Sequence, residues 1–346
     1  MRIVLAYSGG LNTTAAIPWL KARHRADVIA VIADLGQGRA LEAIRDRALA
    51  AGAVRAHVVD ARDEFARAFV LPSLRAAAVR DDGTPQPEAL GRPMVGQVLV
   101  EIARIERAVA VAHGCGPDDL DRARIESAVR VLDPNLTILR PAVEWDLSPA
   151  RVAEYAREQH LPVATRAAGA AAGWRVDVNL WGRTIRPLDP HAPIPDAAFV
   201  QTAAPRSTPK EPASVELSFE GGTPTGINGV AMPLLEMIQT LGAIAGAHGV
   251  GRATADGVGL EAPAAVVLHA AQRALDMDRS SSELQAFGRT VSRAYGDIVH
   301  HGGWFSALRD GLDAFVARTQ QDLDGIVRLT LVNTACRAVN VRSLSP

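Results

Sequence analysis

The first 160 residues alternate between short apolar runs and longer helical patterns, which leaves the chain few possible architectures. Five runs have the length and composition of buried strands: residues 3–6, 28–33, 56–59, 109–112 and 137–139. Between and after them come helical patterns at residues 13–24, 39–53, 61–79, 93–107, 119–131 and 148–160. Short apolar strands between helices are typical of a parallel sheet covered on both faces. The sequence therefore predicts a doubly wound α/β domain.

The composition and periodicity of the sequence change after residue 166. Residues 186–213 hold seven prolines and little periodicity, which predicts an extended connector. Residues 214–232 alternate and carry Asn228-Gly229, a hairpin signal. Helical patterns then cover residues 234–252, 262–275 and about 280–321, the last interrupted at "HHGGWF", before strand-like pieces at 326–332 and 337–341. We expect a nucleotide-binding-type domain over 1–165 and an α+β domain with a helical tail over 166–346.

Composition excludes several classes of function. The 37 basic and 38 acidic residues give a net charge of -1, which argues against a nucleic-acid or anionic-membrane surface. There is no run of 18 apolar residues, so no membrane span is expected. The two cysteines, Cys115 and Cys336, form no disulfide framework, and a reducing cytoplasm fits. The only lysines are Lys21 and Lys210, so the chain has no Walker-type phosphate lysine.

The stretch "VLAYSGGLNTT" at residues 4–14 joins the first strand to the first helix. Ligands of an open parallel sheet bind beyond the carboxyl ends of its strands. Gly9 and Gly10 allow backbone amides to approach an anion, and Ser8, Thr13 and Thr14 add hydroxyl donors at a helix N-terminus. The stretch therefore favours phosphate binding, although a plain strand–helix turn has the same spacing.

Seven motifs in order resemble the argininosuccinate synthase family of the ATP-pyrophosphatase superfamily. They are "AYSGGL", "VIADLGQG", "LGRP", "VAHGC", "NLWGRTI", "GWFSALRDGLDAF" and "GIVRLTL". The likeness runs from Arg2 to about Leu331. Each motif alone is weak, and it is their number and order that make the resemblance specific.

The resemblance implies an ATP-dependent, AMP-forming ligase. In the family, the ureido oxygen of citrulline attacks the α-phosphate of ATP and pyrophosphate leaves. The amine of aspartate then displaces AMP, with Mg²⁺ assisting. The ATP site would consist of Ala6, Tyr7, Ser8, Gly9, Gly10, Asn12, Thr13, Thr14, Ala33 and Gly114. The resemblance also implies a cytoplasmic homotetramer, with the helix at about 280–321 as the oligomerisation element. The partners would be small molecules, with no nucleic acid and no membrane.

The chain departs from the family pattern at the phosphate loop and on the citrulline side. The loop usually has Asp where this chain has Asn12, an amide that is a poorer ligand for a hard cation. The family's citrulline-binding Tyr and Ser fall on Thr84 and Ala89, and two further serines fall on Arg175 and Thr184. The last two ligands of citrulline lie in a segment that is about nine residues shorter here, between Gly251 and Pro263.

The aspartate side is altered as well. In "HGCGPDDLD" the family's Thr and Asn fall on Gly116 and Leu120, whereas its Asp and Arg remain as Asp121 and Arg124. Asp118 and Asp119 add negative charge, so we expect the loop to repel carboxylates and to attract an amine or a metal. The alternative is that Asp118 and Asp119 lie at a solvated helix N-terminus, where Asp is stabilising.

These comparisons define the candidate residues. We expect catalytic roles for Asp121, Arg124 and Asn12, and substrate contacts from Thr84, Arg92, Asp118, Asp121, Arg124, Arg175 and Thr184. Arg175 is either a clamp for a carboxylate or phosphate, or a surface side chain in an Arg-rich protein.

Four other features have plain structural explanations. Cys115 is expected to be a buried thiol, His300-His301 a helix end, and Trp304-Phe305 core, whereas His113 could orient the loop after the fourth strand.

Together these features predict an argininosuccinate-synthase-like ligase with substrates other than citrulline and aspartate. The alternatives are the citrulline–aspartate reaction itself and a non-catalytic nucleotide-binding paralogue. A sulfur transferase acting on tRNA is disfavoured by the neutral charge and the lack of paired cysteines.

Overall fold

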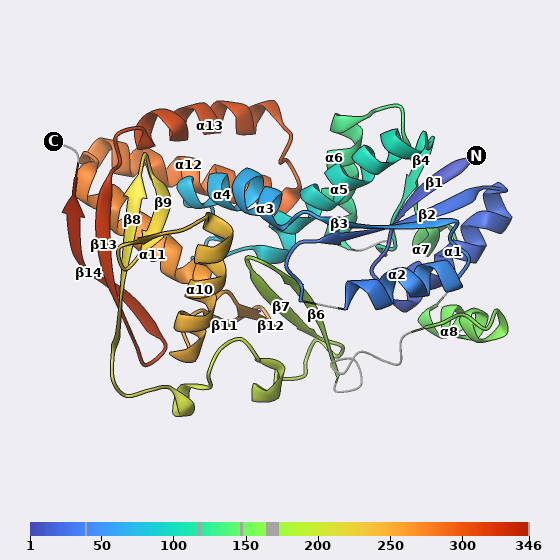
Figure 1. Ribbon diagram of the computed structural model, residues 1–346, viewed down its shortest axis with the longest axis horizontal. Coiled ribbons are helices and arrows are strands. Elements are labelled where there is room, and N and C mark those ends of the chain that lie inside the picture. The colour runs from blue at the N-terminus through green and yellow to red at the C-terminus, as the bar shows by residue number, and fades with distance from the viewer. Residues whose placement is uncertain (39, 117–118, 146–147, 164–172, 345–346) are drawn as a thin grey trace. The chain divides into compact units, whose positions relative to one another are not determined.

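The computed structural model describes residues 1–38, 40–116, 119–145, 148–163 and 173–344, and Figure 1 labels its elements. The chain divides into two compact units. The first unit is formed by Met1–Ala61, Gly91–Ala167 and His301–Phe305, and the second by Arg62–Leu90, Ala168–His300 and Ser306–Pro346. The chain therefore passes from one unit to the other several times. Across the described part of the chain, no helix is both long and apolar enough to cross a membrane.

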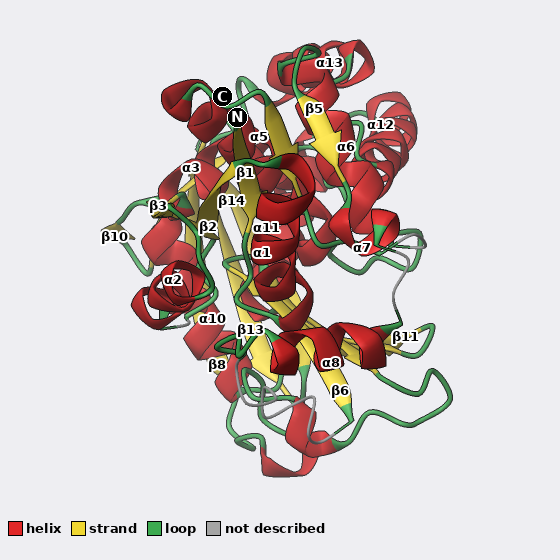
Figure 2. Ribbon diagram, turned by 90° about the vertical axis from the view of Figure 1, so that its right-hand side faces the viewer, coloured by secondary structure: helices red, strands yellow, loops and turns green. Residues whose placement is uncertain are grey.

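The first unit is built on a five-stranded sheet in the order β3-β2-β1-β4-β5. Its strands are β1 (Arg2–Ala6), β2 (Asp27–Asp34), β3 (Arg55–Asp60), β4 (Ala110–Ala112) and β5 (Thr137–Leu139). All four pairings are parallel, and β1, β2 and β3 run side by side in Figure 2. The strand order reverses between β1 and β4, which makes the space beyond their carboxyl ends the topological switch point.

Helices cover both faces of this sheet. The helices α1 (Leu11–His24) and α2 (Leu41–Ala50) share one apolar cluster with alternate strand residues such as Ile3 and Leu5. The helices α5 (Pro87–Glu106) and α6 (Leu120–Leu132) lie on the other side of the sheet (Figure 1). The short helices α7 (Pro141–Glu144) and α8 (Pro149–Glu158) follow β5. The predicted doubly wound α/β domain is confirmed.

The second unit contains two antiparallel sheets. One has the order β10-β9-β8-β13-β14 and the other β11-β12-β7-β6. The strands of the first sheet are β8 (Ala213–Glu220), β9 (Thr223–Ile227), β10 (Val230–Ala231), β13 (Gly325–Val332) and β14 (Ala335–Ser343). Those of the second are β6 (Trp174–Asn179), β7 (Gly182–Pro187), β11 (Arg252–Ala255) and β12 (Val258–Glu261). Between β9 and β10, Asn228 and Gly229 have φ angles of 51° and 77°, as a two-residue hairpin turn of type I′ requires.

Several helical segments complete the part of the second unit that the structure describes. An early run combines α3 (Arg62–Phe65), a π-helical segment (Ala66–Val70) and α4 (Leu71–Arg75). The others are α10 (Leu234–Ala247), α11 (Pro263–Arg279), α12 (Ser282–His301, whose last residue belongs to the first unit) and α13 (Ala307–Gln320). The predicted interruption of this helical region at residues 300–305 is confirmed, since α12 ends at His301, φ of Gly302 is 80° and α13 begins at Ala307.

Two other boundaries differ from the sequence-based prediction. The connector is shorter than expected, because residues up to Pro187 belong to β7, and short 3₁₀ turns occur at Asp196–Ala198 and Pro205–Ser207. The helix expected over 93–107 begins at Pro87, since proline is tolerated in the first turn of a helix.

Candidate active site

The loop between β1 and α1 holds its own hydroxyl groups in place. The hydroxyl of Tyr7, a buried residue, lies 2.9 Å from Thr14 Oγ1, and Ser8 Oγ lies 3.2 Å from Thr13 Oγ1. Thr14 Oγ1 also donates to the carbonyl of Gly10 at 2.8 Å. The hydroxyl-bearing side chains are therefore linked in pairs, which fixes their positions before any ligand binds.

The backbone of this loop depends on its glycines. β1 ends at Ala6, and Gly9 has φ of 74°, a conformation that side chains rarely adopt. α1 begins at Leu11 immediately afterwards, with Gly10 as its N-cap and no side-chain cap. The first amides of α1 are therefore available to an anion at the positive end of the helix dipole. Asn12 lies in this first turn with its side chain exposed.

An arginine that the sequence analysis did not single out contacts the loop. Arg47 of α2 donates from Nη1 to the carbonyl of Gly9 at 3.0 Å, and it lowers the pKa of Tyr7 electrostatically against a larger rise caused by burial. A Cβ added to Gly9 would lie 2.9 Å from the same Nη1. Arg47 thus brings a positive charge to a loop without lysine. In a chain with so many arginines, nothing in the sequence separates it from its neighbours.

Ala33 lies near the carboxyl end of β2, the strand next to β1. Its carbonyl accepts a hydrogen bond from Gln37 Nε2 at 2.7 Å, and Gln37 Oε1 in turn accepts from the backbone amide of Leu35 at 2.7 Å. The "DLGQG" turn therefore folds back on the end of its own strand. Ala33 and the β1–α1 loop consequently lie at the same edge of the sheet, on neighbouring strands.

The segment after β4 packs against the β1–α1 loop. A Cβ added to Gly114 would lie 2.7 Å from Thr13 Cγ2, so only glycine allows this approach. The next residue, Cys115, has its pKa raised to about 12 by burial and by the carboxylates of Asp119 and Asp121. A thiol with this pKa stays protonated at neutral pH and is a poor nucleophile. Cys115 is half-buried and not fully buried as expected, and its raised pKa fits a structural role, which stays a prediction.

Asp121 lies between two arginines in the first turns of α6. Its Oδ1 accepts from Arg124 Nη1 at 2.8 Å, and its Oδ2 lies 2.7 Å from Arg92 Nε of α5. Asp121 and Arg124 are 7% and 5% exposed. The two guanidinium groups lower the pKa of Asp121 against the opposing effect of burial. Three of the expected site residues therefore form one ionic cluster with two positive charges and one negative charge.

The expected negative character of this loop is wrong for the residues that can be described. Asp119 is the N-cap of α6, and its Oδ1 accepts the backbone amide of Asp121 at 3.0 Å. Asp121 is neutralised by its arginines, so it does not repel a carboxylate. Asp118 lies outside the described residues. The alternative of a helix N-terminus that favours Asp is therefore correct for Asp119.

The two positions at which the family has its aspartate-binding Thr and Asn carry no polar side chain here. Leu120, at the first position of α6, is 54% exposed next to the buried Asp121. No atom lies within 4 Å of a Cβ added to Gly116, so this position is open. The surface beside the ionic cluster is thus apolar at one position and empty at the other.

A second buried ionic cluster lies under the loop after β4. Glu126 of α6 is 4% exposed and accepts from Arg140 at 2.6 and 2.8 Å, and also from Arg130. Arg140 and His113 lower the pKa of Glu126 to about 2, against burial. His113 Nε2 lies 3.2 Å from Glu126 Oε1. The sequence analysis missed Glu126, although its place among buried Ile125, Ala128 and Val129 marks it as a carboxylate on an apolar helix face.

The other expected substrate residues belong to the second unit. Thr84 is in a turn, and its hydroxyl donates to Asp82 Oδ1 at 2.6 Å. Arg175 is an exposed residue of β6, and Thr184 is 7% exposed in β7, paired with Asp177. Ala89, at a former ligand position, is 5% exposed.

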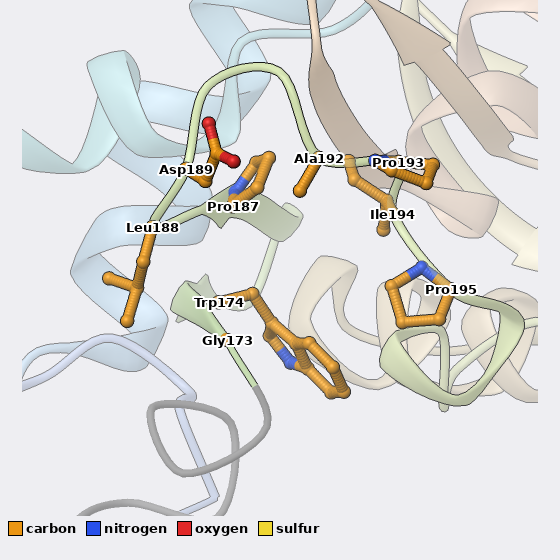
Figure 3. A pocket seen from close by; sticks show the side chains of 9 residues that line it. All are labelled: Gly173, Trp174, Pro187, Leu188, Asp189, Ala192, Pro193, Ile194 and Pro195. Carbon is orange, nitrogen blue, oxygen red and sulfur yellow. The ribbon is translucent and has the colours of Figure 1, made fainter.

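The second unit also contains a pocket of about 320 Å³ at the end of the β6–β7 hairpin (Figure 3). Its walls are mostly apolar, with the Trp174 ring facing the pocket and Asp189 as the charged residue. The lining residues are Gly173, Trp174, Pro187, Leu188, Asp189, Ala192, Pro193, Ile194 and Pro195. Asp189 Oδ1 accepts the amide of His191 at 3.0 Å, which holds the local turn. None of the expected site residues lines this pocket.

The expected helix end at His300-His301 is confirmed, and of the expected core pair Trp304 is buried whereas Phe305 is only half-buried. α12 ends at His301, so the His300-His301 pair is a helix end, and Trp304 is 1% exposed. Among the described residues, no group of three His, Cys, Asp or Glu side chains is arranged to hold a metal ion.

The fold and the loop after β1 define a class of protein. A parallel α/β sheet with a glycine and hydroxyl loop at its switch point is a nucleotide-binding domain. Residues 2–162 match the family model described as the arginosuccinate synthase N-terminal HUP domain, and residues 174–345 match the arginosuccinate synthase C-terminal domain.

Curated relatives agree along almost the whole chain. It is 41% identical over 343 residues to the argininosuccinate synthase of Symbiobacterium thermophilum, covering 95% of this chain and 85% of that protein. It is 39% identical over 342 residues to that of Geobacillus thermodenitrificans, covering 95% and 83%. It is 40% identical over 356 residues to that of Dehalococcoides mccartyi, covering 99% and 86%. The chain belongs to the argininosuccinate synthase family, the AMP-forming carbon–nitrogen ligases, and its HUP domain uses ATP.

Proposed function

We propose that this ligase activates a carboxylate, ureido or amide oxygen with ATP and joins it to an amine, with a substrate pair other than citrulline and aspartate. In the first step the substrate oxygen bonds to the α-phosphorus and the bond to pyrophosphate breaks. In the second step the amine bonds to the activated carbon, the bond from carbon to the AMP oxygen breaks, and the amine loses a proton. The observation that carries the proposal is an ordered phosphate loop beside an ionic cluster that lacks polar neighbours at 116 and 120.

ATP would bind at the carboxyl ends of β1, β2 and β4. The amides of the first turn of α1 and the hydroxyl of the exposed Ser8 would bind the phosphates. Thr13 and Thr14 are 6% and 0% exposed and hydrogen-bonded within the loop, so they would hold its shape. Gly114 closes this side by its contact with Thr13. These groups stabilise charge that develops on the leaving pyrophosphate, so their contribution is positioning and electrostatic stabilisation.

Mg²⁺ would be held chiefly by the phosphates of ATP. The protein donors at the loop are neutral oxygens, namely the exposed amide of Asn12 and nearby hydroxyls. This donor set fits an ion that keeps most of its ligands from phosphate and water. The ion would supply charge neutralisation to the phosphates. Asn12 would orient the phosphates by hydrogen bonds and contribute no negative charge.

The substrates would meet the cluster of Arg92, Asp121 and Arg124. Asp121 would face the attacking amine, and the guanidinium groups of Arg92 and Arg124 would hold its carboxylate in place and in the charged form. Leu120 gives an apolar contact where the family has a polar one. An amine that offers an apolar group there fits better than a dicarboxylate, because a polar group without a partner is costly in such a site.

The test measures AMP and pyrophosphate release from ATP and Mg²⁺ by the purified protein. The panel contains citrulline with aspartate, and carboxylates, ureido compounds and amides each combined with polar and apolar amines. Release that depends on a different pair supports the proposal and names the reaction. Release with citrulline and aspartate at ordinary ligase rates, on the order of 1–10³ s⁻¹, would overturn it.

The citrulline–aspartate reaction is the second candidate, and one specific observation favours it. The 41% identity over 95% of the chain is to a protein named argininosuccinate synthase. The retained pair of Asp121 and Arg124 is also compatible with aspartate. A non-catalytic nucleotide-binding paralogue is the outcome if ATP binds tightly and no pair releases AMP.

We further propose that the protein is a homotetramer in which α12 and α13 contribute to subunit contacts, and that it works in the cytoplasm. Phe287 of α12 and Leu308 of α13 are 55% and 59% exposed, and such side chains are suited to a subunit interface. Sedimentation analysis of wild type and of Phe287→Ser tests the assembly, because a monomeric wild type contradicts it.

A further inference from the structure

His113 is a buried histidine at the point where β4 meets the loop that packs on the phosphate loop. It is 1% exposed, and burial lowers its pKa, although the nearby Glu126 carboxylate has the opposite effect. Its two ring nitrogens have different partners. Nε2 lies 3.2 Å from Glu126 Oε1, and Nδ1 lies 3.4 Å from the backbone nitrogen of Cys115.

These partners allow one tautomer only. The carboxylate of Glu126 accepts but cannot donate, so Nε2 carries the proton. The amide of Cys115 donates but cannot accept, so Nδ1 offers its lone pair. The Glu126 carboxylate is itself held by Arg140 at 2.6 and 2.8 Å and by Arg130. The ring is thus anchored on one side by a fixed ionic cluster and presents an acceptor on the other.

The acceptor side faces the segment that closes the phosphate loop. Gly114 lies between His113 and Cys115, and a Cβ on it would be 2.7 Å from Thr13 Cγ2. A shift of the Cys115 amide therefore moves Gly114 relative to Thr13. The backbone of Gly114 therefore lies so close to the Thr13 methyl group that no side chain fits between them.

We propose that His113 is a positioning residue for nucleotide binding, which holds the Gly114 segment against the phosphate loop through Nδ1 while Glu126 selects its tautomer. This role rests on the proposed ATP site. It names His113 as the residue that sets the distance between the two walls of that site, which are the Gly114 segment and the β1–α1 loop. His113 does not touch the nucleotide.

Two substitutions separate the two hydrogen bonds. In His113→Asn, the side-chain oxygen takes the place of Nδ1 and can accept from Cys115, whereas the contact with Glu126 is lost. In His113→Gln, the side-chain amide reaches the place of Nε2 and can donate to Glu126, whereas the acceptor for Cys115 is lost. The dissociation constant of ATP with Mg²⁺ is measured by calorimetry for both, together with kcat and KM for whichever substrate pair is active.

A matched control exists in the same unit. His57 of β3 forms the same kind of pair, with Nε2 2.8 Å from Oε1 of the buried Glu106. The pair is not part of either wall of the phosphate loop, so His57→Gln is expected to leave the ATP dissociation constant unchanged. For His113→Gln we expect a rise of about fivefold to tenfold, equivalent to one hydrogen bond, with KM for ATP following it. For His113→Asn we expect a change within about twofold.

Nitrogen NMR of imidazole-labelled wild type reads the tautomer without any ligand. A protonated Nε2 and an unprotonated Nδ1 on His113 are expected, and the reverse would overturn the proposal. Equal ATP affinity of the Asn and Gln variants would also overturn it. Wild type that fails to bind ATP at all would instead refute the proposed ATP site, and the NMR result would still stand by itself.

Discussion

Replacing Glu126 with glutamine tests the electrostatics of the buried cluster under the loop after β4. In the folded protein Arg140 and His113 lower the pKa of Glu126 from 4.5 to about 2. At 1.36 kcal/mol per pKa unit, this shift corresponds to about 3 kcal/mol of stability. The Glu126 side chain is 5% exposed, but its partners Arg140 and Arg130 are 34% and 57% exposed, so solvent screens part of the interaction. Glu126→Gln should therefore lower the free energy of unfolding by up to about 3 kcal/mol at pH 7.

The effect should depend on pH in a defined direction. Because the folded pKa lies below the unfolded one, the stabilisation is complete above about pH 4.5 and is lost as the pH falls toward 2. At pH 3.5 it should have fallen to about 2 kcal/mol. The difference between wild type and Glu126→Gln should shrink accordingly.

The assay is urea denaturation followed by circular dichroism at pH 7 and pH 3.5. Glu154→Gln is the matched control, because Glu154 also pairs with an arginine, Arg151, but its side chain is 41% exposed. A surface pair contributes about 0–1 kcal/mol, so this control should change little. A loss below about 1 kcal/mol for Glu126→Gln at pH 7, or a loss that does not shrink at low pH, would refute the reasoning.

Three further substitutions test the active site. Asp121→Asn should reduce AMP release at least tenfold, because the group proposed to face the amine is lost. ATP affinity should stay within about threefold, because the phosphate loop is unchanged. A pyrophosphate-coupled assay measures the first quantity and calorimetry the second. Gly114→Ala should weaken ATP binding about tenfold or more, because the new methyl group meets Thr13 at 2.7 Å, whereas Gly116→Ala should not, since no atom lies within 4 Å. Asn12→Asp should change the rate of AMP release at saturating Mg²⁺ if the protein is an enzyme, and a scaffold would release no AMP in either form.

Local pattern was sufficient to predict the parallel sheet of the first unit, but not that residues 62–90 belong to the second unit and His301–Phe305 to the first. Its strands are short apolar runs and each connection is a helix, so the parallel sheet follows from the sequence. The β6–β7 and β11–β12 hairpins were missed because their strands carry charged residues such as Arg175 and Arg252, and because β7 pairs with β12, which is distant in sequence. Only the fold brings such partners together.

Individual site residues could be predicted from the sequence, but the contacts between them could not. The three-residue spacing of Asp121 and Arg124 on one helix indicates neighbours. That Arg92 completes the cluster depends on the packing of α5 against α6, where Gly96 comes close to Ala128. The charge of the loop was mispredicted for the same reason. A count of carboxylates takes no account of the arginines that neutralise Asp121, or of the helix cap that Asp119 forms.

The bend after α12 has a consequence for how the protein is made. Gly302 belongs to the first unit, and a Cβ on it would lie 2.6 Å from the Cα of Arg124, so this late segment is part of the wall behind the ionic cluster. The ribosome completes β5 at Leu139 but must add more than 160 further residues before Gly302 emerges, which takes on the order of 10–30 s. During that interval the sheet of the nascent chain is fully synthesised, while the backing of Arg124 is missing. A shortened transcript or a nicked chain that ends before residue 302 would thus bear the whole phosphate loop and still lack a finished substrate side.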